Sequence, residues 1–304
     1  MLHAIIDIGS NTIRMAVYQI EGRQFTLLMK RKHTVGLAGY LESGRLVRAG
    51  LEKTVKILHG FMDFINTFRI PHVHAFATAA LRSAVNSRAA VGEIARRTGV
   101  QVRIISGDEE AMYDFIGATQ NIAHADGIMS DIGGGSTEIV SFAGRAMQGR
   151  WSLPLGSLAM SKAHVAALLP TREECRTIAA AVRSVLDEAP AVRDLRARHM
   201  VGMGGVLSSA SRMHALLHPE EPLRLLPADA LPQMIAMFGS GRPLTEADTA
   251  VLLRAAPDRL HNIVPGMIIA SVLAETFAAA DIRYSDSGVR EGYIWKEIIG
   301  AEQR

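Results

Sequence analysis

The sequence has almost no cysteine, no long apolar run and no block of like charges, and each absence excludes a class of protein. Cys175 is the only cysteine among the 304 residues, which rules out an intramolecular disulfide bond and a zinc cage built from thiolates. No apolar run approaches the roughly 18 residues that a membrane-spanning helix needs, so no membrane association is expected. The net charge of +3 comes from scattered basic residues, which argues against a nucleic acid duplex as partner.

Several familiar active-site motifs are also missing. The sequence contains no GxGxxG, GxxxxGKS or GxxxxGKT string, and its 11 histidines show no HExxH spacing. The GxSxG elbow of serine hydrolases is absent as well. The N-terminus enters a strand pattern without the charged, apolar and small-residue regions of a secretory signal, so we expect a cytoplasmic protein.

Length and periodicity predict an α/β protein with two domains, residues 1–125 and 126–304. A chain of this length exceeds one ordinary core and suits two domains of about 100 to 200 residues each. The alternation of strands and helices indicates the α/β class. Strands are expected at 3–8, 13–20, 25–33, 72–77, 102–105, 127–131, 138–142, 146–152, 199–202 and 283–285, and helices through 51–65, at 86–98, from 108, and at 157–168, 171–187, 227–238, 245–255, 265–279 and 288–299.

Two glycine-containing loops repeat one pattern, one in each predicted domain. Both follow a short apolar strand and begin with a carboxylate: Asp7-Ile8-Gly9-Ser10-Asn11-Thr12 and Asp131-Ile132-Gly133-Gly134-Gly135-Ser136-Thr137-Glu138. Glycines let backbone N–H groups approach an anion closely. Because each loop joins two strands of a similar meander, we expect the loops to meet across a shared cleft and to bind phosphate there.

The second loop also predicts a metal site. Its three consecutive glycines cost backbone entropy that a plain hairpin avoids, so a turn with nothing bound is the weaker interpretation. Asp131 and Glu138 flank the loop, and a hairpin brings them back together. Two carboxylates beside a phosphate nest predict Mg²⁺, with Mn²⁺ as the alternative ion.

Three further segments have two interpretations each on their residues alone. Glu109 and Glu110 suit the dipole at a helix start, which explains them fully, although a carboxylate near the domain boundary could also act as a base. Arg82 follows a strand and is either a surface ion-pair residue or a bidentate phosphate ligand. The turn at Gly202–Gly205 is either a tight connection or a further anion or nucleotide nest at a helix start.

The motifs together resemble the exopolyphosphatase and guanosine pentaphosphate phosphohydrolase (Ppx/GppA) family, within the actin, sugar-kinase and Hsp70 ATPase fold group. The resemblance rests on five segments that occur in the family's order along almost the whole chain: residues 7–12, 78–82, 105–111, 131–138 and 287–292. It implies two ribonuclease H-like domains with mixed sheets flanked by helices and an interdomain cleft. It also implies that the last helix, about 288–300, packs back on the first domain.

The resemblance implies a role for each candidate site residue. In such proteins the second glutamate of the Glu-Glu pair is the catalytic base, which is Glu110 here. The metal residues correspond to Asp131 and Glu138. The phosphate-binding residues correspond to Gly133, Gly134, Gly135 and Ser136, with Gly9, Ser10, Asn11 and Arg82 on the opposing wall.

The expected activity is magnesium-assisted hydrolysis that releases terminal orthophosphate from inorganic polyphosphate, from guanosine pentaphosphate, or from both. An ATP-dependent kinase or ATPase of the same fold group, and a sensor that binds phosphate chains without turnover, are the alternatives. A homodimer is compatible with the sequence. Longer members continue into a helical C-terminal region, so grip on long chains through such a region is in doubt here.

Overall fold

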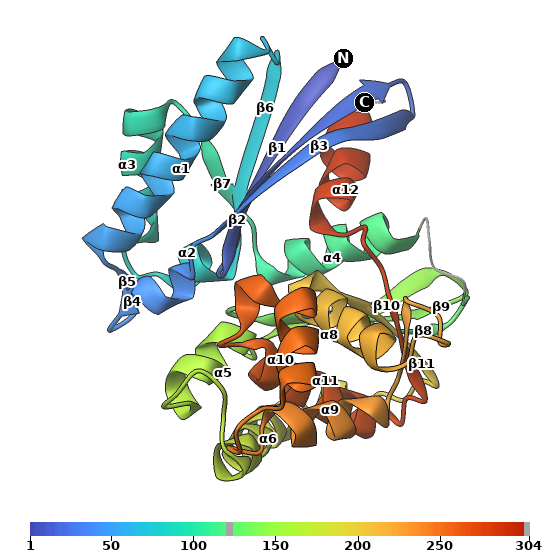
Figure 1. The fold of residues 1–304 in the computed structure, drawn as a ribbon. Coiled ribbons are helices and arrows are strands. Elements are labelled where there is room, and N and C mark those ends of the chain that lie inside the picture. The colour runs from blue at the N-terminus through green and yellow to red at the C-terminus, as the bar shows by residue number, and fades with distance from the viewer. Residues whose placement is uncertain (120–123, 301–304) are drawn as a thin grey trace. The chain divides into compact units, whose positions relative to one another are not determined.

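The computed structural model describes residues 1–119 and 124–300, and these residues form both strands and helices (Figure 1). Among these residues no helix combines the length and the apolar character needed to cross a membrane. In chain order the elements are β1 (Leu2–Ile8), β2 (Thr12–Glu21), β3 (Gln24–Thr34), the 3-10 turn η1 (Leu37–Tyr40), β4 (Leu41–Glu42), β5 (Arg45–Leu46), α1 (Arg48–Thr67), β6 (His72–Ala77), α2 (Ala79–Ser83), α3 (Ser87–Thr98), β7 (Val102–Ile104), α4 (Gly107–Thr119), β8 (Gly127–Ile132), β9 (Thr137–Ala143), β10 (Ala146–Leu153), α5 (Ser157–His164), α6 (Arg172–Asp187), α7 (Pro190–Arg193), β11 (His199–Met203), α8 (Gly204–Leu217), β12 (Leu225–Pro227), α9 (Ala230–Phe238), α10 (Glu246–Ala255), the 3-10 turn η2 (Pro257–Arg259), α11 (Ile263–Phe277), β13 (Asp281–Tyr284), α12 (Val289–Tyr293) and the π-helical segment η3 (Ile294–Ile299).

The chain forms two compact units. Unit 1 comprises Met1–Glu110 together with the chain from Ile294 onward, and unit 2 comprises Ala111–Tyr293. The division falls inside α4, because the first turn of that helix groups with unit 1 and the remainder with unit 2. The domain boundary between residues 125 and 126 stays a prediction from the sequence.

Unit 1 is built on a five-stranded sheet in the order β3-β2-β1-β6-β7. The predicted meander is confirmed: β1 pairs antiparallel with β2, and β2 with β3, whereas β6 and β7 run parallel to β1. Side chains alternate between the faces of a strand. Ile6 and Ile8 belong to the apolar cluster that includes α1 and α3, so Asp7 between them projects from the opposite face.

Unit 2 is built on a six-stranded sheet in the order β10-β9-β8-β11-β13-β12. One face carries the larger core, in which Ile128 and Ile139 pack with apolar side chains of α6, α8, α9 and α11. The other face carries a smaller cluster, in which Met129 and Val140 pack with Ala111, Phe115 and Ala118 of α4. The predicted second meander, β8 to β10, is therefore confirmed, with helices covering both faces of its sheet.

Two predicted helix ends were wrong. The helix expected from residue 227 starts at Ala230, because Leu225 to Pro227 pairs antiparallel with β13 as an edge strand, a position that tolerates proline. The helix expected over 157–168 ends at His164. Beyond it, the N–H of Ala166 donates to Glu174 Oε1 at 2.9 Å. Glu174 is also part of the capping box that starts α6, so this backbone is bound to the next helix instead of continuing α5.

The parallel pairing of β1 with β6 gathers three histidines, His3, His72 and His74, into a histidine cluster in unit 1. The ring centroids of His3 and His72 lie 4.5 Å apart, and His3 Nδ1 lies 3.2 Å from His74 Nε2. Burial, reinforced by the two neighbouring imidazoles and the chain's N-terminus, lowers the pKa of His3 to about 4. Burial and His72 also lower the pKa of His74. His3 and His74 are thus electrically neutral at pH 7.

Cys175 is buried on α6 and is not an activated nucleophile. Its thiol donates to the Gly239 carbonyl oxygen at 3.4 Å, and burial raises its pKa to about 11. A thiol of this kind carries little thiolate near neutral pH, and the thiolate is the reactive form. This environment is that of a passive thiol.

Candidate active site

The β1–β2 turn in unit 1 holds two buried polar side chains that have no partner among the described residues. Ser10 is 5% exposed and Asn11 is 7% exposed, and neither the Ser10 hydroxyl nor the Asn11 amide makes a hydrogen bond there. The backbone around them is fixed, because the Asn11 carbonyl accepts from Val35 and Gly36 at 2.8 and 2.9 Å. Buried polar groups are nearly always hydrogen-bonded in folded proteins. A bound polar ligand would explain why these two are not.

Glu110 is the buried carboxylate of the acidic pair. It lies in the first turn of α4, is 8% exposed, and its Oε2 accepts a hydrogen bond from Arg82 Nη1 at 2.6 Å. Arg82, at the end of the short helix α2, also reaches the Ile105 carbonyl oxygen at 3.3 Å. The sequence left the partner of Arg82 open, and the structure places it on the candidate base.

Glu109, the neighbouring carboxylate, has a different environment. Its Oε2 accepts from the Ser106 N–H at 2.8 Å, while its own N–H donates to the Ser106 hydroxyl at 3.1 Å. This reciprocal arrangement caps the start of α4. Burial opposes ionisation of Glu109, but the Ser106 backbone hydrogen bond and the nearby Arg103 guanidinium outweigh it, so the pKa is lowered. The helix-capping interpretation therefore applies to Glu109, whereas Glu110 is held by a guanidinium.

The loop after Asp131 in unit 2 repeats the hydrogen bond of the β1–β2 turn. Gly133 N–H donates to the Ser136 carbonyl at 2.9 Å, just as Gly9 N–H donates to the Thr12 carbonyl at 3.0 Å. The repeat predicted from the sequence is thus a repeat of local structure. The N–H groups of Gly9 and Gly133 close their turns, and a phosphate-binding role for these two residues stays a prediction.

Helix α5 fixes the direction of the next two N–H groups in this loop. Ser157 N–H donates to the Gly133 carbonyl at 2.9 Å, and Leu158 and Ala159 N–H groups donate to the Gly134 carbonyl at 3.0 Å each. In a trans peptide the N–H points opposite to the preceding C=O. The N–H groups of Gly134 and Gly135 therefore point away from α5, as a phosphate nest requires.

Asp131 and Glu138 lie directly opposite one another on β8 and β9. Strand alternation places both on the face that carries α4, since Asp131 is two residues from Met129 and Glu138 two residues from Val140. Glu138 is 1% exposed, and its Oε1 accepts from the hydroxyls of Ser136 at 2.7 Å and Ser152 at 2.8 Å. An all-oxygen set with two carboxylates fits the donor preference of Mg²⁺ or Mn²⁺.

The turn at Gly202–Gly205 lies beside the same aspartate. Gly204 has a φ of +80° and begins α8, and a side chain there would collide with Asp131 Oδ1. A side chain on Gly205 would collide with the guanidinium of Arg259, which is 7% exposed. A carboxylate and a guanidinium thus already adjoin this helix start. A nucleotide site at the turn stays a prediction.

The closing motif, residues 287–292, has a packing role within unit 2. A side chain on Gly292 would overlap the Tyr113 carbonyl oxygen, and one on Gly117 would overlap the Gly288 carbonyl. The backbones of α12 and α4 therefore approach closely because these positions are glycine. The Gly288 N–H donates to Glu291 Oε2 at 3.0 Å, which caps α12.

Sequence reasoning missed three residues that shape the second loop. Ser152 holds Glu138, Ser157 holds the Gly133 carbonyl through both its N–H and its hydroxyl, and Gly156 lets α5 reach the loop. Pairing β9 with β10 in the correct register would have revealed Ser152, which lies opposite Glu138. No local sequence signal marks the other two.

The predicted site residues thus gather into two groups, one in each unit. Unit 1 contains the β1–β2 turn residues and the linked pair of Arg82 and Glu110, and unit 2 contains the glycine loop with Asp131, Ser136 and Glu138. Their catalytic and binding roles stay predictions.

Comparisons with known proteins identify the fold and the relatives. Exopolyphosphatase 1 of Mycobacterium tuberculosis is 27% identical over 308 residues, covering 97% of this chain and 87% of that protein. The guanosine-5'-triphosphate,3'-diphosphate pyrophosphatase of Aeromonas hydrophila is 27% identical over 297 residues, covering 97% of this chain but 59% of that protein. An exopolyphosphatase structure from Cytophaga hutchinsonii superposes with a TM-score of 0.86 at 21% identity over 99% of this chain and 98% of that chain.

The Aquifex aeolicus structure of a Ppx/GppA family member superposes with a TM-score of 0.77 at 24% identity, covering 99% of this chain and 98% of that chain. These superpositions confirm the predicted fold class, two α/β units built on sheets flanked by helices. The model of the Ppx/GppA phosphatase family matches residues 16–299. Motif order, fold and family model therefore agree, and the chain belongs to the Ppx/GppA phosphatase family.

Proposed function

We propose that the protein hydrolyses the terminal phosphoanhydride bond of inorganic polyphosphate or of guanosine pentaphosphate and releases orthophosphate. Family membership and the names of the two curated relatives support this class of reaction. The observation that carries the proposal is the environment of Glu110. A carboxylate that is nine-tenths buried and held by a guanidinium has the form expected of a positioned general base.

In the proposed reaction Glu110 orients a water molecule and takes its proton as the water oxygen bonds to the terminal phosphorus. The bond from that phosphorus to the bridging oxygen breaks, and the shortened chain leaves. Ser10, Asn11 and the N–H groups of Gly134 and Gly135 donate hydrogen bonds to phosphate oxygens. Asp131 and Glu138 would hold Mg²⁺, or Mn²⁺ in its place, which when bound offsets negative charge on those oxygens.

Arg82 has a defined place in this scheme. Its bond to Glu110 fixes the direction of the carboxylate, which limits the positions from which that carboxylate can accept the proton of a water molecule. Arg82 is therefore proposed as the residue that positions the base, in addition to its predicted contact with phosphate. Ser136 and Ser152 position Glu138 in the same way in unit 2.

Phosphate release measured on three substrates tests the proposal. The purified protein is incubated with long polyphosphate, with short polyphosphate and with guanosine pentaphosphate at matched concentrations, with Mg²⁺ and with a chelator. We expect orthophosphate release without ATP, and loss of that release on chelation. ATP-dependent transfer to an acceptor would instead identify a kinase, and saturable binding without phosphate release would identify a sensor.

A further inference from the structure

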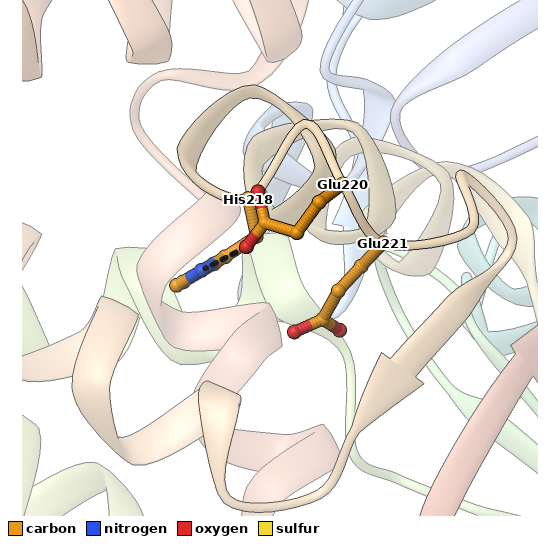
Figure 2. Close-up of side chains that lie close together, drawn as sticks. All are labelled: His218, Glu220 and Glu221. Carbon is orange, nitrogen blue, oxygen red and sulfur yellow. Dashed lines mark ion pairs between the residues drawn. The ribbon is translucent and has the colours of Figure 1, made fainter.

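The end of helix α8 carries a group of three potential metal ligands, His218, Glu220 and Glu221 (Figure 2). One ligand atom from each residue lies within 4.8 Å of the others, and His218 Nδ1 is 3.7 Å from Glu220 Oε1. An ion about 2.1 Å from each donor would separate its donors by about 3 to 4 Å. Small side-chain rotations therefore suffice to close the three donors on one ion.

The backbone holds these three residues in a fixed turn. The Glu221 N–H donates to the His218 carbonyl at 3.1 Å, which closes a turn with Pro219 at its second position. Proline fixes φ and favours that position. The Ser211 hydroxyl of α8 also donates to the Leu223 carbonyl just after the turn. The donors are thus largely positioned before any ion arrives, which lowers the entropic cost of binding.

A buried histidine, His214, contacts one of the three residues, Glu221. His214 is 3% exposed, and its Nε2 lies 2.9 Å from Glu221 Oε2. Because a carboxylate only accepts, Nε2 carries the proton, and Nδ1 has no partner among the described residues. The ring also packs against His218, with centroids 4.8 Å apart. A ligating carboxylate held by a second residue in this way is typical of protein metal sites.

The position in the fold also favours a cation. His218 follows the last turn of α8, where the helix dipole presents partial negative charge. Two adjacent carboxylates add charge of the same sign, and a divalent cation would offset both. An imidazole and two carboxylates suit borderline ions such as Zn²⁺, whereas Mg²⁺ prefers oxygen ligands alone.

We propose that His218, Glu220 and Glu221 form a binding site for a divalent transition-metal ion, with His214 as the residue that positions Glu221. The site is distinct from the residues proposed to hold magnesium. Asp131 of β8 lies beside Gly204, the first residue of α8, whereas His218 follows the last residue of that helix, and the 14 residues of α8 span about 21 Å. The proposal does not depend on the hydrolytic activity.

The affinity of the protein for zinc tests the site. Bound metal is first removed with a chelator and gel filtration, and zinc binding is then measured by competition with a chromogenic zinc indicator. We expect wild-type protein to bind one Zn²⁺ at this site. His218→Gln and Glu220→Gln should each weaken that binding at least about tenfold, since even residues that only support a ligand contribute that much. Both side chains lie at the surface, so neither variant should unfold. A large excess of Mg²⁺ should not displace the zinc.

Two matched variants in unit 2 separate coordination from general electrostatics. His164→Gln and Glu246→Gln remove an imidazole and a surface carboxylate elsewhere, and both should bind zinc as the wild type does. Anomalous diffraction at the zinc edge from a zinc-soaked crystal should place the ion among the three side chains. No measurable binding, equal losses in the matched variants, unchanged affinity in His218→Gln, or an ion located elsewhere would each overturn the proposal.

Discussion

Replacing Glu110 by glutamine should separate catalysis from stability. Glutamine keeps an acceptor oxygen for the Arg82 guanidinium, which lies 2.6 Å from the carboxylate, but it cannot take a proton from water. Loss of a general base costs about 10² to 10⁴ in rate, or about 2.7 to 5.4 kcal/mol of transition-state stabilisation. The ion pair between two charged groups becomes a hydrogen bond from the charged guanidinium to a neutral amide oxygen, which costs about 1 kcal/mol of folding free energy.

Glu109→Gln provides the matched comparison one residue away. This change weakens the cap on Ser106 and the exposed ion pair with Arg103, which also costs about 1 kcal/mol of folding free energy. The two variants should therefore unfold at similar urea concentrations. Only Glu110→Gln should lose phosphate release, whereas Glu109→Gln should stay close to the wild type.

The assay measures kcat and KM for phosphate release on the best substrate from the three-substrate comparison, together with urea unfolding of each variant. Substrate binding by Glu110→Gln, measured in the presence of Mg²⁺, should persist. If Glu110→Gln binds substrate and turns it over within about tenfold of the wild type, Glu110 is not the base. Equal loss of activity in Glu109→Gln would show that the defect lies in the start of α4 rather than in the chemistry.

Three further predictions concern packing and charge. Gly156→Ala should lower phosphate release at least about tenfold while the protein stays folded, because the new methyl group would displace the backbone of the glycine loop. Gly292→Ala should destabilise unit 2 by about 3 kcal/mol or more in urea unfolding, because the methyl group would overlap the Tyr113 carbonyl; Gly60→Ala on the exposed side of α1 should instead stabilise by about 0.5 to 1 kcal/mol. The pKa of His3 is about 4 in the folded protein and about 6.5 when unfolded, so the unfolded chain binds the proton first. The free energy of unfolding should therefore fall by up to about 3 kcal/mol as pH drops from about 6.5 to about 4, and His3→Leu should flatten that slope.

The sequence alone predicted most of the strands and helices in their order along the chain, together with the resemblance to the family, although it missed short elements such as α2 and β12. Short apolar runs predicted the strands of the meander at residues 3–33, and an apolar stripe at helical spacing predicted α1, since such patterns record which parts of an element face a core. The repeat of an acidic residue and glycine at Asp7 and Asp131 is local, so the order of residues along the chain is enough to reveal it. In the structure, each of the two turns is closed by an equivalent hydrogen bond, from the glycine N–H to a carbonyl three residues later.

Only tertiary structure decided which acidic residue of the pair is buried and what it contacts. Glu109 and Glu110 are chemically identical neighbours in one helical turn, and helical periodicity does not say which face of α4 is covered. The contact of Arg82 with Glu110 joins residues 28 positions apart, and that of Ser152 with Glu138 depends on strand register. Such contacts form when separate elements pack, and no local pattern in the chain encodes them.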